Sequence, residues 1–203
     1  PETYGTLSYA PEQIESYMRL AVEHGFDIAC HAIGDEANTI VLDCAERTHA
    51  HGSIEHAQML KECDIPRLEH AMDDRDVIAR FWGTPAGIPY AFNSLHKAGT
   101  KLLMGSDAPV APLDPWLAIS AAVFGTESSD REPFQPEQCL DFETALASST
   151  AVGRVALRDA DAADLVLLDC DPSIIDSPEA MRAMPEHVLG TMLAGRWTYQ
   201  QAE

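Results

Sequence analysis

Three residues of types that bind metals or move protons stand at the ends of short apolar stretches. His31 follows the run FDIAC at 26–30, His56 lies within SIEHA at 53–57, and Asp107 closes KLLMGSD at 101–107. Imidazole and carboxylate groups are ligands of Zn²⁺ and other divalent metals. A carboxylate beside such a metal can also take a proton from bound water. Either histidine alone is more often a hydrogen-bonded core residue, but the three residues together favour a metal site.

The segments that carry these residues alternate between helical and extended patterns. Strands are predicted over 26–30, 53–57 and 101–107. The predicted helices cover 11–24, 35–48, 62–70, 88–98, 114–123 and 141–148. This alternation is typical of an α/β protein with a parallel sheet. Because the carboxyl ends of parallel strands meet at one edge, or ring one mouth of a (β/α)8 barrel, the three residues are expected to share a pocket.

The pattern changes after residue 150. The runs GRVAL, ADLVLLD and HVLGTMLAGRWTYQ are short and β-rich, and Asp, Pro and Gly separate them. They predict a small β module that begins near residues 151–153.

Charge and cysteine usage exclude several classes of function. The chain of 203 residues has 33 acidic and 13 basic residues and a formal net charge of −20, which disfavours nucleic acid as a partner. No run of 18 apolar residues and no signal-like leader is found, so no membrane association is expected. The five cysteines include no C-x-x-C pair, which argues against a disulfide framework and favours a cytoplasmic location.

The other polar residues near these motifs have simpler interpretations. Glu55 precedes His56 in its predicted strand, so its side chain is expected on the opposite face, as a salt bridge to the helix layer or a rim charge. Asp35 is interpreted as a helix N-cap or first-turn acid, and Ser106 as a turn residue, since no G-x-S-x-G surrounds it. The remaining histidines are interpreted as structural or solvent-facing: His24, His49, His51, His70, His96 and His187.

Four motifs in order along the chain resemble the amidohydrolase superfamily. They are HAIGDEAN, SIEHAQML, KLLMGSDAPVAPLDPWLAI and ADLVLLDCDP, and they are most similar to amidohydrolase family 3, the group that includes N-substituted formamide deformylases. The resemblance implies an α/β fold: a (β/α)8 TIM-type metallo-hydrolase barrel followed by a small β-sandwich built from both chain ends.

The resemblance also implies roles for single residues. HAIGDEAN matches strand five of the family and SIEHAQ strand six, so His31 and His56 are similar to metal ligands. GSDAP matches strand eight, which makes Asp107 a metal ligand and the catalytic general base. The implied reaction hydrolyses a non-peptide, amide-like C–N bond of a small molecule by attack of metal-bound hydroxide. Zn²⁺ is the leading metal, although nitrogen and oxygen ligands also accept Mn, Fe or Ni.

The sequence departs from the family pattern in two places. The family has an H-x-H pair on strand one, whereas the only H-x-H here, at 49–51, ends a predicted helix. No strand-like run lies between His56 and Lys101, so strand seven is expected to be missing. A complete barrel needs about 250 residues. Residues 1–150 are therefore interpreted as the C-terminal part of a barrel, and 151–203 as the C-terminal part of the sandwich.

Two kinds of function stay open. The first is a metal-dependent amidohydrolase of which this chain is an incomplete part and which is inactive in isolation. The second is a catalytically inactive, truncated homologue that acts as a binding or oligomeric scaffold piece. The expected partners are a small-molecule substrate and either further copies of the chain or a complementing N-terminal segment.

Overall fold

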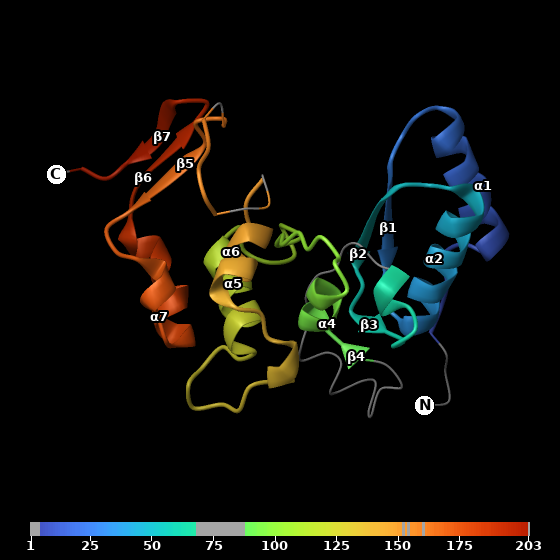
Figure 1. Ribbon diagram of the computed structural model, residues 1–203, viewed down its shortest axis with the longest axis horizontal. Coiled ribbons are helices and arrows are strands. Elements are labelled where there is room, and N and C mark those ends of the chain that lie inside the picture. The colour runs from blue at the N-terminus through green and yellow to red at the C-terminus, as the bar shows by residue number, and fades with distance from the viewer. Residues whose placement is uncertain (1–4, 68–87, 152, 154, 160, 203) are drawn as a thin grey trace. The chain divides into compact units, whose positions relative to one another are not determined.

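The computed structural model describes residues 5–67, 88–151, 153, 155–159 and 161–202 of a mixed α/β chain (Figure 1). The chain divides into two compact units, Pro1–Leu103 and Met104–Glu203. The first unit contains α1 (Pro11–Glu23), β1 (Ile28–Ala32), α2 (Asp35–Thr48), β2 (Gly52–His56), β3 (Met59–Leu60), the 3₁₀ turn η1 (Ile65–Arg67), β4 (Ile88–Pro89) and α4 (Phe92–Lys97). The predicted boundary between barrel and sandwich at residue 150 stays a prediction.

Two helices and two parallel strands make the core of the first unit. β1 and β2 are hydrogen-bonded in parallel, and α1 and α2 pack beside each other and against this pair (Figure 1). Pro11 occupies the first turn of α1, where its missing N–H costs nothing. The buried cluster between the helices and strands consists of Met18, Ala32, Val41 and Cys44, with Ile14, Ile28, Cys30, Ala37, Ile40, Ala45, Ala50 and Ile54 packed against it.

The segment after β2 is fastened back onto α2. β3 pairs with β4 in antiparallel register, and η1 follows β3. The guanidinium of Arg67 in η1 forms ion pairs with Asp43 and Glu46 of α2 and with the buried Asp64. These carboxylates raise the pKa of Arg67 above its ordinary value, with Glu46 the largest cause. A buried carboxylate is thereby neutralised by a partner that stays charged at any physiological pH.

The described residues of the second unit combine helices with an antiparallel sheet. It contains α5 (Pro115–Phe124), η2 (Pro136–Gln138), α6 (Phe142–Ser148), β5 (Leu165–Leu168), η3 (Pro172–Ile174), α7 (Pro178–Arg182), η4 (Met184–His187), β6 (Val188–Leu193) and β7 (Arg196–Gln200). Side chains of Asp114, Asp141 and Ser177 accept hydrogen bonds at the starts of α5, α6 and α7. α5 packs against α6 and α7, and the strands follow the order β5–β6–β7.

Several predicted elements differ from the observed ones. The predicted strand at 101–107 is wrong: a strand needs a hydrogen-bonded neighbour, and none of the described residues pairs with it. The predicted helix at 88–98 begins only at Phe92, because Ile88–Pro89 forms β4. The described part of GRVAL contains no strand, whereas ADLVLLD and HVLGTMLAGRWTYQ do form β5, β6 and β7.

The region expected to lack strand seven is only partly described. Residues 68–87 lie outside the described residues, and they include the last three residues of the predicted helix at 62–70. The described part of that segment is a turn at 62–64 followed by η1, so the predicted α-helix is wrong there. In the described part of the chain the strands form sheets of two, two and three strands, and these do not close into a barrel.

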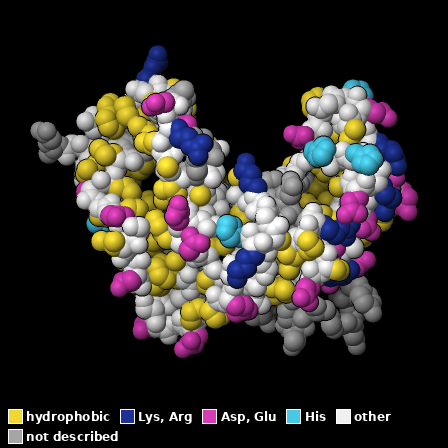
Figure 2. Space-filling view, in the orientation of Figure 1, with side chains coloured by type: hydrophobic (Ala, Val, Ile, Leu, Met, Phe, Trp, Pro, Cys, Tyr) yellow, Lys and Arg dark blue, Asp and Glu magenta, His cyan; other side chains and the backbone are white. Residues whose placement is uncertain are grey.

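The surface agrees with the acidic composition. Asp and Glu side chains are spread over the visible faces of both units (Figure 2). Among the residues that the structure describes, every helix is too short or too polar to cross a lipid bilayer.

Candidate metal centre

His31 lies on the face of β1 that α1 and α2 leave uncovered. Ile28, Cys30 and Ala32 alternate with it along the strand and belong to the cluster packed under the helices. Successive side chains of a strand point to opposite faces, so His31 points away from the helices, and its side chain is exposed. In a barrel this is the face that the strands would enclose.

The side chain of His56 lies on the same face as that of His31 because the backbone departs from strand geometry at His56. Ile54 packs with the helix-covered cluster, so ideal alternation would turn His56 towards the helices as well. His56 instead has φ 74°, and the Ala57 N–H donates back to the Glu55 carbonyl at 3.1 Å. This tight turn at the end of β2 brings the imidazole of His56 to that of His31.

The two imidazoles are in direct contact. His31 Nδ1 and His56 Nε2 are 2.9 Å apart, and the ring centroids are 5.0 Å apart. Two such nitrogens either share one proton or both act as acceptors for a cation. Zn–N bonds are about 2.0–2.1 Å, so two nitrogen ligands of one ion lie roughly 3 Å apart. The pair therefore fits a divalent metal.

Asp107 lies in the second unit. It follows Ser106 at the start of a turn in which the Val110 N–H donates to the Asp107 carbonyl at 2.9 Å. Its carboxylate is exposed, and its φ of 49° is in the left-handed region, which aspartate tolerates. The preceding chain is fastened where the Met104 N–H donates to the Ser148 carbonyl at the end of α6.

The structure gives Glu55 a place different from the predicted one. The parallel register pairs Glu55 with His31, so both belong to the face away from α1 and α2. The Glu55 carboxylate accepts a hydrogen bond from the Ser53 hydroxyl on the same strand. Of the two predicted roles, the salt bridge to the helix layer is therefore wrong and the rim charge stays open, and Glu55 is an acidic neighbour of the histidine pair.

Asn38, the last residue of HAIGDEAN, positions both histidine-bearing segments, and the sequence interpretation missed it. The residue is fully buried in the first turn of α2. Its Nδ2 lies 3.1 Å from the Ala32 carbonyl, directly after His31, and 3.1 Å from the Met59 carbonyl, three residues after His56. It also reaches the Gly34 carbonyl at 2.9 Å. An amide among the apolar residues of a helix stripe is the signal that could have identified it.

Other polar residues match their simpler interpretations. Asp35 is the first residue of α2, and its carboxylate accepts a hydrogen bond from the Glu36 N–H. His24 and His49 occupy the C-caps of α1 and α2, as predicted for helix ends. His70 lies outside the described residues.

A histidine pair at the carboxyl ends of neighbouring parallel strands is typical of metal-dependent α/β enzymes. Comparison with known protein families identifies which group this is. The family model described as "Amidohydrolase family" matches residues 2–199 of the sequence. The chain therefore belongs to the amidohydrolase family. The resemblance to amidohydrolase family 3 is thus confirmed.

Individual relatives are similar over three quarters or more of this chain. Protein LONG AFTER FAR-RED 3 of Arabidopsis thaliana is 28% identical over 98% of this chain and 38% of its own length. Putative amidohydrolase YtcJ of Bacillus subtilis is 27% identical over 100% of this chain and 43% of its own. The crystal structure of an uncharacterized metal-dependent hydrolase from Pyrococcus furiosus aligns with a TM-score of 0.61 at 29% identity, over 75% of this chain and 34% of that protein.

The curated relatives are much longer than this chain. The chain spans about two fifths of the length of the curated relatives that it matches. Both sequence alignments, of 228 and 229 residues, are longer than the 203-residue chain. The relatives therefore contain residues, within the matched region, that this chain lacks.

Proposed function

We propose that this chain is part of a metal-dependent hydrolase that cleaves a non-peptide, amide-like C–N bond in a small molecule. The observation that carries the proposal is the 2.9 Å contact between His31 Nδ1 and His56 Nε2 at the ends of two paired parallel strands. Membership of the amidohydrolase family and similarity to a protein described as a metal-dependent hydrolase support it.

The proposal assigns separate tasks to the three predicted site residues. His31 and His56 offer neutral imidazole nitrogens, and Asp107 offers a carboxylate oxygen, as ligands of one divalent metal, with Zn²⁺ the leading choice. The metal, when bound, supplies Lewis-acid activation of water and of the substrate carbonyl. Asp107 accepts the proton of the attacking water and returns it to the leaving nitrogen.

Several further features of the whole protein belong to the same proposal. The substrate is a small molecule, and the net charge of −20 disfavours nucleic acid. A cytoplasmic location follows from the cysteine usage. Because the chain spans about two fifths of its curated relatives, we expect residues 1–203 alone to be inactive and to need a complementing N-terminal segment.

A second function is favoured by one observation. In the described residues the strands do not close into a barrel, and residues 101–106, directly before Asp107, form no strand. A chain that never completes the barrel would act instead as a non-catalytic binding or oligomeric scaffold piece.

Metal analysis separates the two functions. The chain is purified without chelator, and metal per chain is measured for the wild type and for His31→Ala, His56→Ala and His51→Ala, the last an exposed histidine outside the pair. The metal-hydrolase proposal expects one equivalent of metal to be lost in the first two variants and kept in the third. A metal content that neither His31→Ala nor His56→Ala lowers contradicts it and favours the scaffold.

The expected inactivity of the isolated chain needs its own measurement. Purified residues 1–203 are assayed against a panel of small amides and N-formyl amines, beside Asp107→Asn. Hydrolysis by the wild-type chain that is absent from Asp107→Asn would overturn the expectation that a further segment is needed, while supporting the role of Asp107.

A further inference from the structure

Three side chains with metal-binding atoms meet at one end of the antiparallel sheet in the second unit. Asp169 and Cys170 directly follow β5, and His187 is the last residue of η4, directly before β6. Leu168 is in register with Val188, so these residues stand at the same end of the strand pair. The Asp169 N–H donates to the His187 carbonyl at 3.1 Å, which fixes the two chain segments together.

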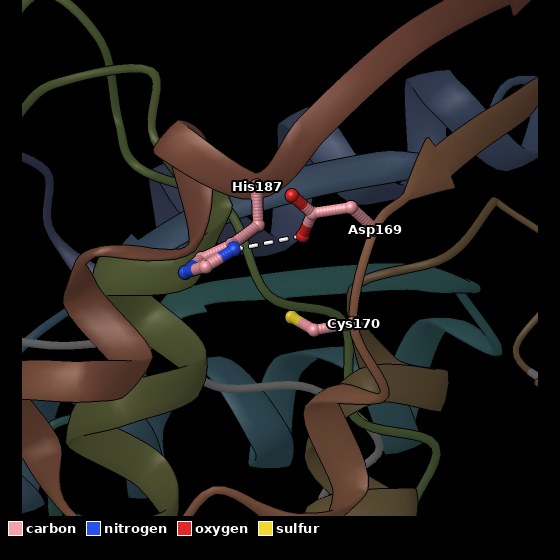
Figure 3. Close-up of side chains that lie close together, drawn as sticks. All are labelled: Asp169, Cys170 and His187. Carbon is pink, nitrogen blue, oxygen red and sulfur yellow. Dashed lines mark hydrogen bonds and ion pairs between the residues drawn. The ribbon is translucent and has the colours of Figure 1, made fainter.

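The side chains converge from these segments. His187 Nδ1 and Asp169 Oδ1 are 2.8 Å apart, and the ligand atoms of all three residues lie within 4.8 Å of one another. Figure 3 shows the Cys170 sulfur beside the paired carboxylate and imidazole. Cys170 is half-buried, and its Sγ is 3.8 Å from the sulfur of the buried Met184. The thiol is therefore held in place.

The local charge favours a cation over a nucleophilic role. The carboxylates of Asp169 and Asp171 place negative charge on both sides of the Cys170 thiol. A nucleophilic cysteine needs the opposite, a pKa lowered by a positive neighbour. A metal ion would reverse this field, because a coordinating thiol loses its proton to solvent as the metal binds.

We propose that Asp169, Cys170 and His187 form a binding site for a divalent metal of borderline softness, with Zn²⁺ as the fitting ion. One oxygen, one sulfur and one nitrogen ligand suit Zn²⁺ and its spectroscopic substitute Co²⁺, and exclude Mg²⁺ and Ca²⁺, which take oxygen ligands. Three protein ligands leave a fourth position for water. The site is separate from the histidine pair, which lies in the other unit.

The position of the site suggests what a bound metal would do. Residues 171–186 leave the sheet after β5 and return before β6, and they contain η3, α7 and most of η4. α7 packs on α5, and Glu179 of α7 accepts hydrogen bonds from the Ser129 N–H and hydroxyl, both at 2.6 Å. A metal bound by both Cys170 and His187 would link the two ends of the segment 171–186. Such a link should stabilise the second unit.

Cobalt titration of the full 203-residue chain tests the site. The chain carries His31→Ala and His56→Ala, so that the proposed catalytic metal does not contribute, and thiolate-to-cobalt charge transfer is followed in the near ultraviolet. The band is expected in this background and in Cys63→Ser, the control with an exposed thiol, and is expected to be lost in Cys170→Ser and weakened in His187→Ala. A band that Cys170→Ser leaves intact, or no band in the background, overturns the proposal.

A second measurement needs no substitution at the site. The wild-type chain is alkylated with iodoacetamide with and without Zn²⁺, and modification of each cysteine is followed by mass spectrometry. Zn²⁺ is expected to slow alkylation of Cys170 at least about tenfold while leaving Cys63 unchanged. Equal rates at Cys170 with and without Zn²⁺ refute the site, whatever the outcome for the histidine pair.

Discussion

Replacing Asn38 with alanine tests whether one buried amide holds the histidine pair together. Asn38 Nδ2 donates to the carbonyl of Ala32, the neighbour of His31, and to that of Met59, shortly after His56. Both interactions are buried. Without them, the loop after β1 and the segment after β2 are joined only by backbone hydrogen bonds such as those from Ala57 to Ala32 and from Met59 to Ile33. The variant should therefore destabilise the first unit and also weaken metal binding by the pair.

The size of the effect follows from counting hydrogen bonds. Truncation removes two buried hydrogen bonds with unequal consequences. The Ala32 carbonyl keeps the Ala57 N–H as a donor at 3.0 Å, so that loss costs about 0.5–1.5 kcal/mol. The Met59 carbonyl loses the donor that Asn38 supplies, at a cost of about 1–3 kcal/mol. Asn38 Oδ1 is itself buried without a partner among the described residues, so removing it returns part of that cost. The free energy of unfolding is therefore expected to fall by about 1–3 kcal/mol.

Urea unfolding followed by circular dichroism measures this change, with Glu36→Gln as the control. Glu36 lies in the same helical turn and is exposed, and it forms an ion pair with Lys61 that should contribute less than about 1 kcal/mol. Asn38→Asp replaces the donor with an oxygen in the same shape and should be at least as destabilising as Asn38→Ala. If Asn38→Ala loses no more stability than Glu36→Gln, the amide does not have the role assigned to it.

Two further changes test the packing of each unit. Gly52→Ala should lower the free energy of unfolding by at least about 2 kcal/mol, because a Cβ at this position would lie 1.9 Å from the Ile28 carbonyl oxygen and φ is 149°. Thermal unfolding measures this loss. An unchanged melting temperature would contradict the β1–β2 geometry. Hydrogen bonds from Ser129 lower the pKa of Glu179 from 4.5 to about 2, so the stabilisation by the ionised carboxylate is present above pH 4.5 and is lost as the pH falls towards 2. Wild type should therefore lose its advantage over Glu179→Gln in this window, and stability curves that stay parallel from pH 6 to pH 2 would refute the link between α7 and Ser129.

The elements that the sequence predicted well are those whose stability is visible locally. α1, α2, α5 and α6 have helical spacing and a proline, an acid or a cap at their start, so their bounds agree with the predicted ones to within a few residues. The strand predicted at 101–107 failed for the opposite reason. Its apolar run is suitable for a strand, but strand formation depends on a neighbour that is distant in sequence, and local spacing carries no information about that neighbour.

The same distinction, between local features and contacts distant in sequence, applies to the candidate site. The residue types of His31 and His56 sufficed to predict that they belong together, but the rule of alternation along a strand would have separated them, because Ile54 and His56 are two residues apart and Ile54 packs under the helices. Register and turn geometry are properties of the assembled chain. The positioning role of Asn38 was not predicted for a related reason. It depends on hydrogen bonds to the Ala32 and Met59 carbonyls, which only the folded chain brings close to this side chain.

The turn at His56 is the strongest structural argument for function in the first unit. A positive φ at a residue with a Cβ costs of order 1 kcal/mol or more, and glycine would remove this cost. Positive φ alone marks nothing here, because His49 at a helix C-cap and Ala194 in the β6–β7 turn also have it. At His49 the conformation simply ends a helix, as many helices do. At His56 it turns an imidazole away from the helix-covered face and onto a second imidazole. Alternation along the strand would favour the opposite orientation. The turn therefore supports the proposal that the two nitrogens serve as ligands of one metal.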